Sequence, residues 1–173
     1  MSFVRSFMKN KYAWVGAMAA AVVVLDQITK YLVVKRFHLH ESVTVIQGFF
    51  NLTYVRNKGA AFGILAGSHG MWRSAFFISV DFVALAAIVM LIKKSEDRLS
   101  VIAFSLIAGG AVGNLIDRLR LGAVVDFIEW YYRSYHWPTF NIADSAISVG
   151  VGLLAVEMLF PGKQVAAEDA EGK

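Results

Sequence analysis

The stretch LSVIAFSLIAGGAVGNLIDR, residues 99–118, joins a long apolar run to a polar end. A helix needs about 20 mostly apolar residues to cross the hydrocarbon of a bilayer, and residues 99–116 come close to that length. Gly109 and Gly113 have the G-x-x-x-G spacing that lets a second helix approach closely. The stretch therefore predicts a membrane-spanning helix that packs tightly against another helix.

The polar end of this stretch needs an explanation of its own. Asn114 precedes Asp117 by three residues and Arg118 by four, so the three side chains share one helix face. A charged group at mid-membrane costs about 2.5–3.5 kcal/mol even on lenient scales. Such a face is expected to look into a cavity or onto a partner, although Asp117 and Arg118 could instead form a solvated helix end.

Three more segments have comparable length and apolar character. Charged residues make up 17% of the chain and apolar residues 57%, whereas soluble domains carry about a quarter charged residues. We therefore predict an α-helical membrane protein with four transmembrane helices in a single domain, residues 1–173. The other three spans are predicted at about residues 12–34, 73–92 and 140–160. The polar tail, residues 163–173, is expected to be disordered.

The distribution of basic residues bears on orientation. Four spans place both termini on one side of the membrane. Lys and Arg outside the spans divide evenly, eight on each side, but three of them lie in the short loop 93–98. Short loops weigh most in the positive-inside rule, so the termini are predicted to be cytoplasmic.

Composition excludes several function classes. The chain has no cysteine, which removes disulfides, thiolate metal sites and a cysteine nucleophile. The net charge of +4 is small and dispersed, so no nucleic-acid partner is predicted. The histidines fall in predicted loops and no H-E-x-x-H or G-x-S-x-G motif occurs, so we predict neither a metal nor a cofactor. A Ser–Lys or Ser–His dyad is not excluded by residue type.

The long connection after the first span has a strand-like centre. VTVIQGFFNLTYVRN, residues 43–57, is rich in β-branched and aromatic residues, is interrupted at Gly48 and leads into the turn sequence NKG. We predict a small extracytoplasmic β-sheet here, a hairpin or three strands at the membrane surface. An irregular interfacial loop is the alternative.

The connection between the third and fourth spans is strongly aromatic. FIEWYYRSYHW, residues 127–137, contains six aromatic rings of Phe, Trp and Tyr, and Trp and Tyr favour the headgroup boundary. The spacing of Phe127, Trp130, Tyr131 and Ser134 predicts a short interfacial helix. This helix could be a gate over a site or an aromatic anchor.

Charges also occur inside other predicted spans. Asp26 and Lys30 are four residues apart, which favours an intrahelical ion pair that eases insertion. Asp81 is mid-span and has no partner in its own segment. A protonated acid or a contact with another helix would explain it.

Two further acids flank the junction between the third and fourth spans. Asp126 lies in GAVVDFIEW and Asp144 in FNIADSAIS. Because these spans are joined on one side of the membrane, both acids emerge at the same face and at similar depth. Asn141 and Asp144 also have the spacing of a helix capping box, so capping is an alternative role for that pair.

Close carboxylates at an apolar boundary have a distinctive chemistry. Both cannot ionise easily in a low dielectric, so one keeps a proton near neutral pH. The pair then contains a base that can take a proton from water and an acid that can polarise a peptide carbonyl. This arrangement predicts an aspartic endopeptidase.

Five sequence blocks in this order resemble the bacterial lipoprotein signal peptidases (signal peptidase II), a family of aspartic membrane endopeptidases. The resemblance covers nearly the whole chain. The blocks are DQITK (26–30), NKGAAFG (57–63), GGAVGNLIDR (109–118), GAVVDF (122–127) and FNIADSAI (140–147).

The resemblance implies roles for individual residues. Asp126 and Asp144 would be the catalytic dyad. The implied substrate-binding residues are Asn57, Asn114, Arg118 and Asn141. The implied supporting residues are Asp26, Lys30, Asp117 and Gly110.

The resemblance also implies substrates and location. The substrates would be diacylglyceryl-modified prolipoproteins, cut just before the lipidated cysteine near the outer leaflet of the bacterial inner membrane. Expected partners are these substrates, membrane lipids and globomycin-type inhibitors, and the protein is expected to be a monomer. The substrate's signal helix is expected to lie among the spans, against small residues such as Gly109 and Gly113.

Two other function classes remain for comparison. A small proton-coupled transporter could use Asp26, Asp81, Asp117 and Asp144 as a relay, but the sequence has no inverted repeat or broken helix. An assembly or lipid-binding module without chemistry would leave the paired acids unexplained.

Overall fold

Four long helices dominate the computed structural model, which describes residues 10–59 and 70–160. Each helix is long and apolar enough to cross a membrane, which confirms the four predicted spans. The predicted tail, residues 163–173, and part of the NKGAAFG block lie outside the described residues. The helices are α2 (Lys11–Arg36), α3 (Gly70–Lys94), α4 (Arg98–Leu121) and α5 (Ile142–Leu159).

Helix α4 is the centre of the helix bundle. About half of its membrane-length window is buried by protein, whereas α3 and α5 each bury 11% of theirs. It packs against α2, α3 and α5. The other three helices therefore pack around α4, which contains the glycine-bearing stretch 99–118. Their outer faces remain apolar and exposed, as contact with lipid requires.

Glycines on α4 allow the close helix packing that the sequence predicted. A Cβ atom at Gly109 would lie 2.8 Å from the Cβ of Val22 on α2, and one at Gly113 would lie 2.7 Å from the Asp26 carboxylate. Since α2 covers both positions, the expectation that the substrate's signal helix packs against Gly109 and Gly113 is wrong. These glycines allow the protein's own helices to pack closely together.

Gly110 offers a test of this packing. A Cβ there would collide with the backbone oxygen of Ala143 on α5, so Gly110→Ala is expected to lower the free energy of unfolding by about 1–3 kcal/mol through overpacking. Gly152→Ala is the matched control, because nothing lies within 4 Å of that position and alanine favours a helix. Thermal unfolding in detergent would measure both, and equal midpoints for the two variants would contradict the prediction.

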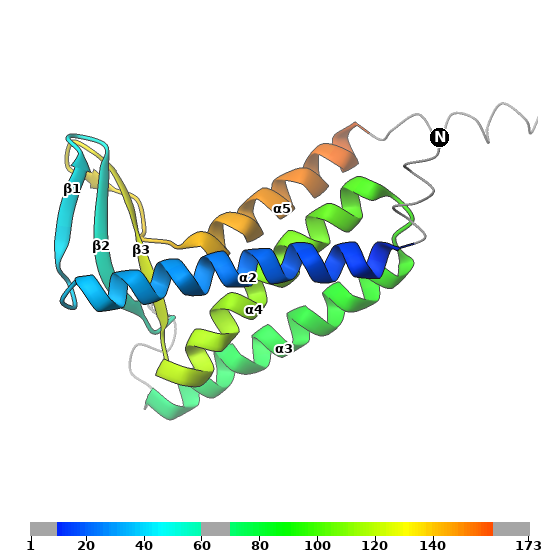
Figure 1. Ribbon diagram of the computed structural model, residues 1–173, viewed down its shortest axis with the longest axis horizontal. Helices are drawn as coiled ribbons and strands as arrows, with labels where there is room; N and C mark the ends of the chain where they lie inside the picture. The colour runs from blue at the N-terminus through cyan, green and yellow to red at the C-terminus, as the bar shows by residue number, and fades with distance from the viewer. Residues whose placement is uncertain (1–9, 60–69, 161–173) are drawn as a thin grey trace, which may run out of the picture.

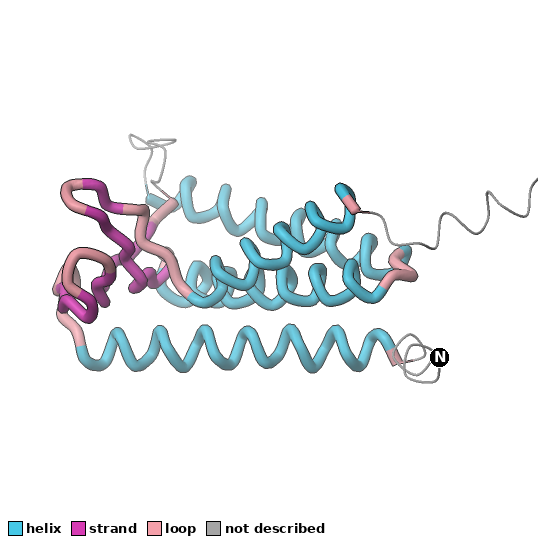
Figure 2. The backbone as a smooth tube through the Cα atoms, turned by 90° about the horizontal axis from the view of Figure 1, so that it is seen from above, coloured by secondary structure: helices cyan, strands magenta, loops and turns pink. Residues whose placement is uncertain are grey.

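One end of the helix bundle carries a four-stranded antiparallel sheet (Figures 1 and 2). Its first hairpin confirms the sheet predicted from residues 43–57, and Gly48 takes a φ of 78° in the turn. The strand order follows the chain order. The strands are β1 (Ser42–Ile46), β2 (Phe50–Asn57), β3 (Val124–Tyr132) and β4 (Tyr135–His136).

The interfacial helix predicted for residues 127–137 is wrong, because this segment forms β3, a tight turn and β4. β3 pairs with β2, for example through Leu52 opposite Ile128. The helical spacing of the aromatic residues was therefore coincidental. A strand satisfies the backbone hydrogen bonds of this segment against a partner that is remote in sequence.

A buried apolar cluster fixes the sheet to the helices. It joins Val33 near the end of α2 to Tyr54 of β2 and to Val125 and Phe127 of β3. Beyond the sheet, the backbone of Phe140 exchanges hydrogen bonds of 2.8 and 3.0 Å with Ile128. This bridge sets the start of α5 against β3, so that residues 126 and 144 become neighbours.

Candidate active site

The two acids predicted to converge lie on different elements. Asp126 is a buried residue of β3, paired with Val55 of β2. Asp144 lies in the first turn of α5 and is half-buried. The bridge between Phe140 and Ile128 holds these two elements together. Strand and helix therefore each contribute one carboxylate to a single site at the sheet end of the helices.

Asn141 connects the two carboxylates. Its side-chain nitrogen donates to Oδ1 of Asp126 at 2.7 Å, and its backbone N–H donates to Oδ2 of Asp144 at 3.2 Å. Its side-chain oxygen accepts from the backbone N–H of Asp144, which completes the capping box that was the alternative role for this pair. Capping and pairing thus use the same residues, and neither interpretation excludes the other.

Two more asparagines complete the hydrogen bonds of the acids. Asn57 at the end of β2 donates to Oδ2 of Asp126 at 3.0 Å. Asn114 of α4 donates to Oδ1 of Asp144 at 2.7 Å. Amide donors fix a carboxylate in place without adding charge, so these bonds orient both acids and add no cation to the pair.

The environment of Asp126 favours a protonated carboxyl. Burial, followed by the negative charge of Asp144, raises the pKa of Asp126 to about 7. Hydrogen bonds from Asn57 and Asn141 and the positive charge of Lys30 oppose this rise. Asp126 can therefore hold a proton near neutral pH.

A buried ion cluster lies behind the two acids. The Nζ atom of Lys30 is 2.9 Å from both Asp26 and Asp117 and donates to the side-chain oxygen of Asn114 at 3.0 Å. The intrahelical pair of Asp26 and Lys30 is confirmed, but it is part of a larger network across two helices. All three ammonium hydrogens are used, so Lys30 positions Asn114 and, through it, Asp144.

Each carboxylate of this cluster also holds a backbone N–H. Asp26 accepts from the N–H of Ala143 in the first turn of α5 at 3.0 Å, and Asp117 accepts from the N–H of Val125 at 3.0 Å. These bonds tie α2 and α4 to the residues next to Asp144 and Asp126. Asp26 and Asp117 thus position the segments that carry the two acids.

Gln27 is a member of the site that residue-type reasoning missed. Its side-chain nitrogen lies 3.1 Å from both Asp26 and Asp117 and 3.2 Å from the backbone oxygen of Gly113. The sequence signal for Gln27 is its position inside the DQITK block, between Asp26 and Lys30.

Arg118 forms its ion pair with a third acid, Asp81. Its Nη1 atom is 2.6 Å from Oδ2 of Asp81 on α3, and its guanidinium lies 5.8 Å from the centre of the Phe77 ring. This ion pair identifies the partner of Asp81. The three polar residues follow the predicted spacing on α4, but Arg118 bonds to α3, whereas Asn114 and Asp117 bond to Lys30. The same ion pair occupies the Asp81 carboxylate, which the alternative proton transporter would use as a relay group.

The described side chains contain no cluster of metal ligands. Within residues 10–59 and 70–160, no three His, Asp or Glu residues are grouped so that they could hold a metal ion. Asp126 and Asp144 are bonded to side-chain amides and to the backbone N–H of Asn141. What this arrangement can do is divide one proton between two carboxylates at the edge of the apolar region.

The comparisons with known proteins agree with one another. The sequence profile of the family described as Signal peptidase (SPase) II, peptidase family A8, matches residues 18–160. The lipoprotein signal peptidases of Syntrophus aciditrophicus and Geobacter metallireducens are each 50% identical to this chain. These alignments cover 84% and 88% of this chain and 92% and 94% of the relatives.

Solved structures show the same similarity in three dimensions. Two structures described as bacterial membrane enzymes superpose with TM-scores of 0.77 and 0.76 at 38% and 37% sequence identity. They match 86% and 88% of this chain and 94% and 92% of their own lengths. The similarity therefore includes the helices and the sheet that position the two acids.

Proposed function

This chain belongs to the signal peptidase II family of aspartic peptidases and cleaves the signal peptides of prolipoproteins, and we propose that Asp126 and Asp144 are its catalytic carboxyls. The observation that carries the proposal is their connection through Asn141, which donates to both. A water held between the carboxyls would touch a base on one side and an acid on the other.

The proposed reaction uses one proton and one water. The ionised carboxylate, Asp144, takes a proton from the water as the water oxygen attacks the scissile carbonyl carbon. The protonated carboxyl, Asp126, gives its proton to the carbonyl oxygen, and a tetrahedral diol forms. Asp144 then gives its proton to the amide nitrogen while Asp126 takes one hydroxyl proton of the diol. The C–N bond breaks, which releases a new carboxyl terminus and a new amine and restores both acids to their starting states.

The substrate is proposed to be a diacylglyceryl-modified prolipoprotein, cut before the lipidated cysteine. A lipid anchor would confine the scissile bond to the headgroup depth, which is the depth expected of the two acids. Positioning of this kind can lower a barrier by several kcal/mol. We place the termini in the cytoplasm and the sheet and the site near the outer leaflet, within a monomer that globomycin-type lipopeptides inhibit.

Substrate contacts are proposed for the polar residues around the acids. Asn57, Asn114 and Asn141 already orient the carboxyls and would hold the substrate backbone at the same time. Arg118 stays a predicted substrate contact, and its bond to Asp81 would have to be exchanged or shared for it to act as one. Gly110 supports the site indirectly, by allowing α5 to lie close to α4.

The pH dependence of cleavage tests the proposed mechanism. Because the pKa of Asp126 is about 7, the pair loses its proton above that pH, and kcat/KM is expected to fall about tenfold per pH unit on this limb. At low pH the pair gains a second proton and loses its base, so the profile is bell-shaped. The measurement is cleavage of a lipidated precursor by purified enzyme in nanodiscs, with the unlipidated precursor as control. A flat profile from about pH 4 to 9 would argue against a shared proton.

A further inference from the structure

The two acids line separate cavities with opposite chemistry. The cavity beside Asp144 has a volume of about 380 Å³ and apolar walls that include Trp130, Trp137, Phe140 and Val149. The cavity beside Asp126 has a volume of about 360 Å³ and is lined by three cations, Arg56, Lys58 and Arg73. A peptide that crosses the pair of acids would therefore meet an apolar pocket on one side and a positive pocket on the other.

Among the described residues, no ion pair neutralises the three cations. In the part of the chain that the structure describes, the ion pairs involve Lys30, Arg118 and His136, not these residues. Arg56 donates through Nε to the Tyr54 hydroxyl, a neutral acceptor, and Lys58 is exposed. The cavity thus keeps an excess positive charge that an anionic group could satisfy.

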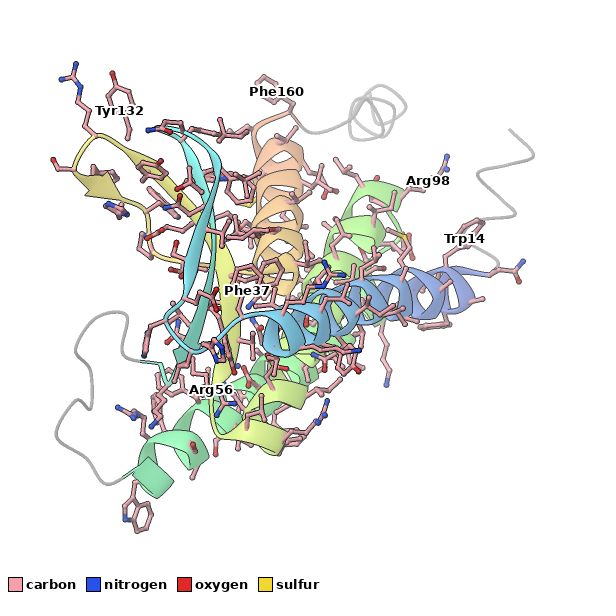
Figure 3. The ribbon with its side chains drawn as sticks, turned by 60° about the vertical axis from the view of Figure 1, so that its left-hand side comes forward. Trp14, Phe37, Arg56, Arg98, Tyr132 and Phe160 are labelled. Atoms are coloured by element: carbon pink, nitrogen blue, oxygen red, sulfur yellow. The ribbon has the colours of Figure 1, made fainter. Side chains whose placement is uncertain are left out.

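The position of Arg73 adds to this charge excess. It lies in the first turn of α3, where the helix macrodipole already presents partial positive charge and disfavours a cation. Figure 3 shows Arg56 at the sheet end of the molecule, close to α3 and α4. The end of β2 and the start of α3 therefore both contribute cations to the cavity that the Asp126 carboxylate lines.

We propose that the cavity beside Asp126 binds the polar segment that follows the scissile bond, and that it selects an acidic side chain within the first few residues of that segment. This inference rests on the proposed function. The signal peptide is apolar and would leave the cations unsatisfied, whereas the segment after the cysteine leads into water and can carry carboxylates. Because Asp126 lines the cavity, its occupant is joined to the reacting bond by only a short length of chain.

The test uses two lipidated peptides that differ by one residue, Glu or Gln, placed two to four residues after the cysteine. Wild-type enzyme in zwitterionic nanodiscs at low ionic strength is expected to cleave the Glu peptide with a kcat/KM about 3–10-fold higher, the size of one or two partly exposed ion pairs. The preference is expected to shrink as salt is raised, because the Debye length falls to about 3 Å at 1 M.

Variants assign the preference to this cavity. Lys58→Gln is expected to reduce the Glu preference, and Lys58→Glu is expected to reduce it further, with Arg56 and Arg73 still present in the cavity. Loss of structure alone would lower kcat/KM for both peptides equally. Arg120→Gln is the matched control, since Arg120 is an exposed cation at the end of α4 outside the cavity, and it is expected to keep the full preference.

Several outcomes overturn the inference. Equal kcat/KM for both peptides with wild-type enzyme would overturn it while the proposed function stands, because both peptides are still cleaved. A preference that is undiminished in Lys58→Glu would also overturn it. So would a preference that appears only when the nanodisc lipid is made anionic, which would favour a headgroup site. Failure of wild-type enzyme to cleave either peptide would instead remove the proposed function and this inference with it.

Discussion

Asp126→Asn and Asp144→Asn are each expected to lower the cleavage rate of a lipidated prolipoprotein by about 10²–10⁴-fold. Asparagine keeps the size of the side chain and one hydrogen-bond acceptor, so the bond from Asn141 to position 126 can persist. It cannot exchange a proton with water or with the substrate, and the remaining acid then has no partner with which to share one. Single-turnover cleavage in nanodiscs is the measurement.

A second carboxylate on the same strand provides the control. Glu129 lies on β3, where it bonds to Asn51 and His136 and not to either catalytic candidate. Glu129→Gln is therefore expected to keep turnover within a few fold of the wild type. If Asp126→Asn or Asp144→Asn retained a tenth of wild-type turnover while folded in the membrane, the assignment of the pair would be wrong.

Lys30→Met is expected to be the most destabilising single substitution among those considered. It leaves Asp26 and Asp117 buried without a cation, and breaking a buried ion pair in this way typically costs about 3–5 kcal/mol. Asn114 also loses its donor from Lys30, so the orientation of Asp144 should suffer in any protein that folds. Thermal unfolding in detergent, followed by circular dichroism, would measure the loss.

A triple variant that removes all three charges distinguishes the electrostatic contribution of the ion cluster from its packing contribution. Lys30→Met combined with Asp26→Asn and Asp117→Asn is expected to recover much of the lost stability, because no unpaired charge remains buried. Lys35→Met is the control on the same helix, since Lys35 is exposed. A single Lys30→Met variant as stable as the wild type would mean that the cluster contributes little to folding.

The spans and the meeting of the two acids could be predicted from local sequence. Membrane-length apolar runs are read within one segment. Asp126 lies in the connection that follows α4 and Asp144 at the start of α5, so their common membrane face follows from chain order. The second acidic partner of Lys30 could not be predicted from local sequence. Asp117 is 87 positions further along the chain, and only the packing of α2 on α4 brings the two together.

The incorrect helix at residues 127–137 and the missing partner of Asp81 have one physical cause, which is pairing between segments far apart in the chain. Residues 127–137 have a helix-like aromatic spacing, but β2 offers them an edge to pair with, and this tertiary choice overrides local pattern. Asp81 had no visible partner because Arg118 lies on another helix. Pairings between distant segments depend on the assembled fold, and a single sequence does not reveal them.

The order in which the chain supplies the site has a consequence for biosynthesis. Asn57 and Lys30 come from its early part, Asp126 follows α4, and Asp144 arrives only with α5, whose first turn must dock on Asp26. A nascent chain that has inserted three spans lacks one acid and the asparagine that links the pair. With Asp126 and Asp144 as the proposed catalytic pair, cleavage is expected to begin only once α5 has entered the membrane.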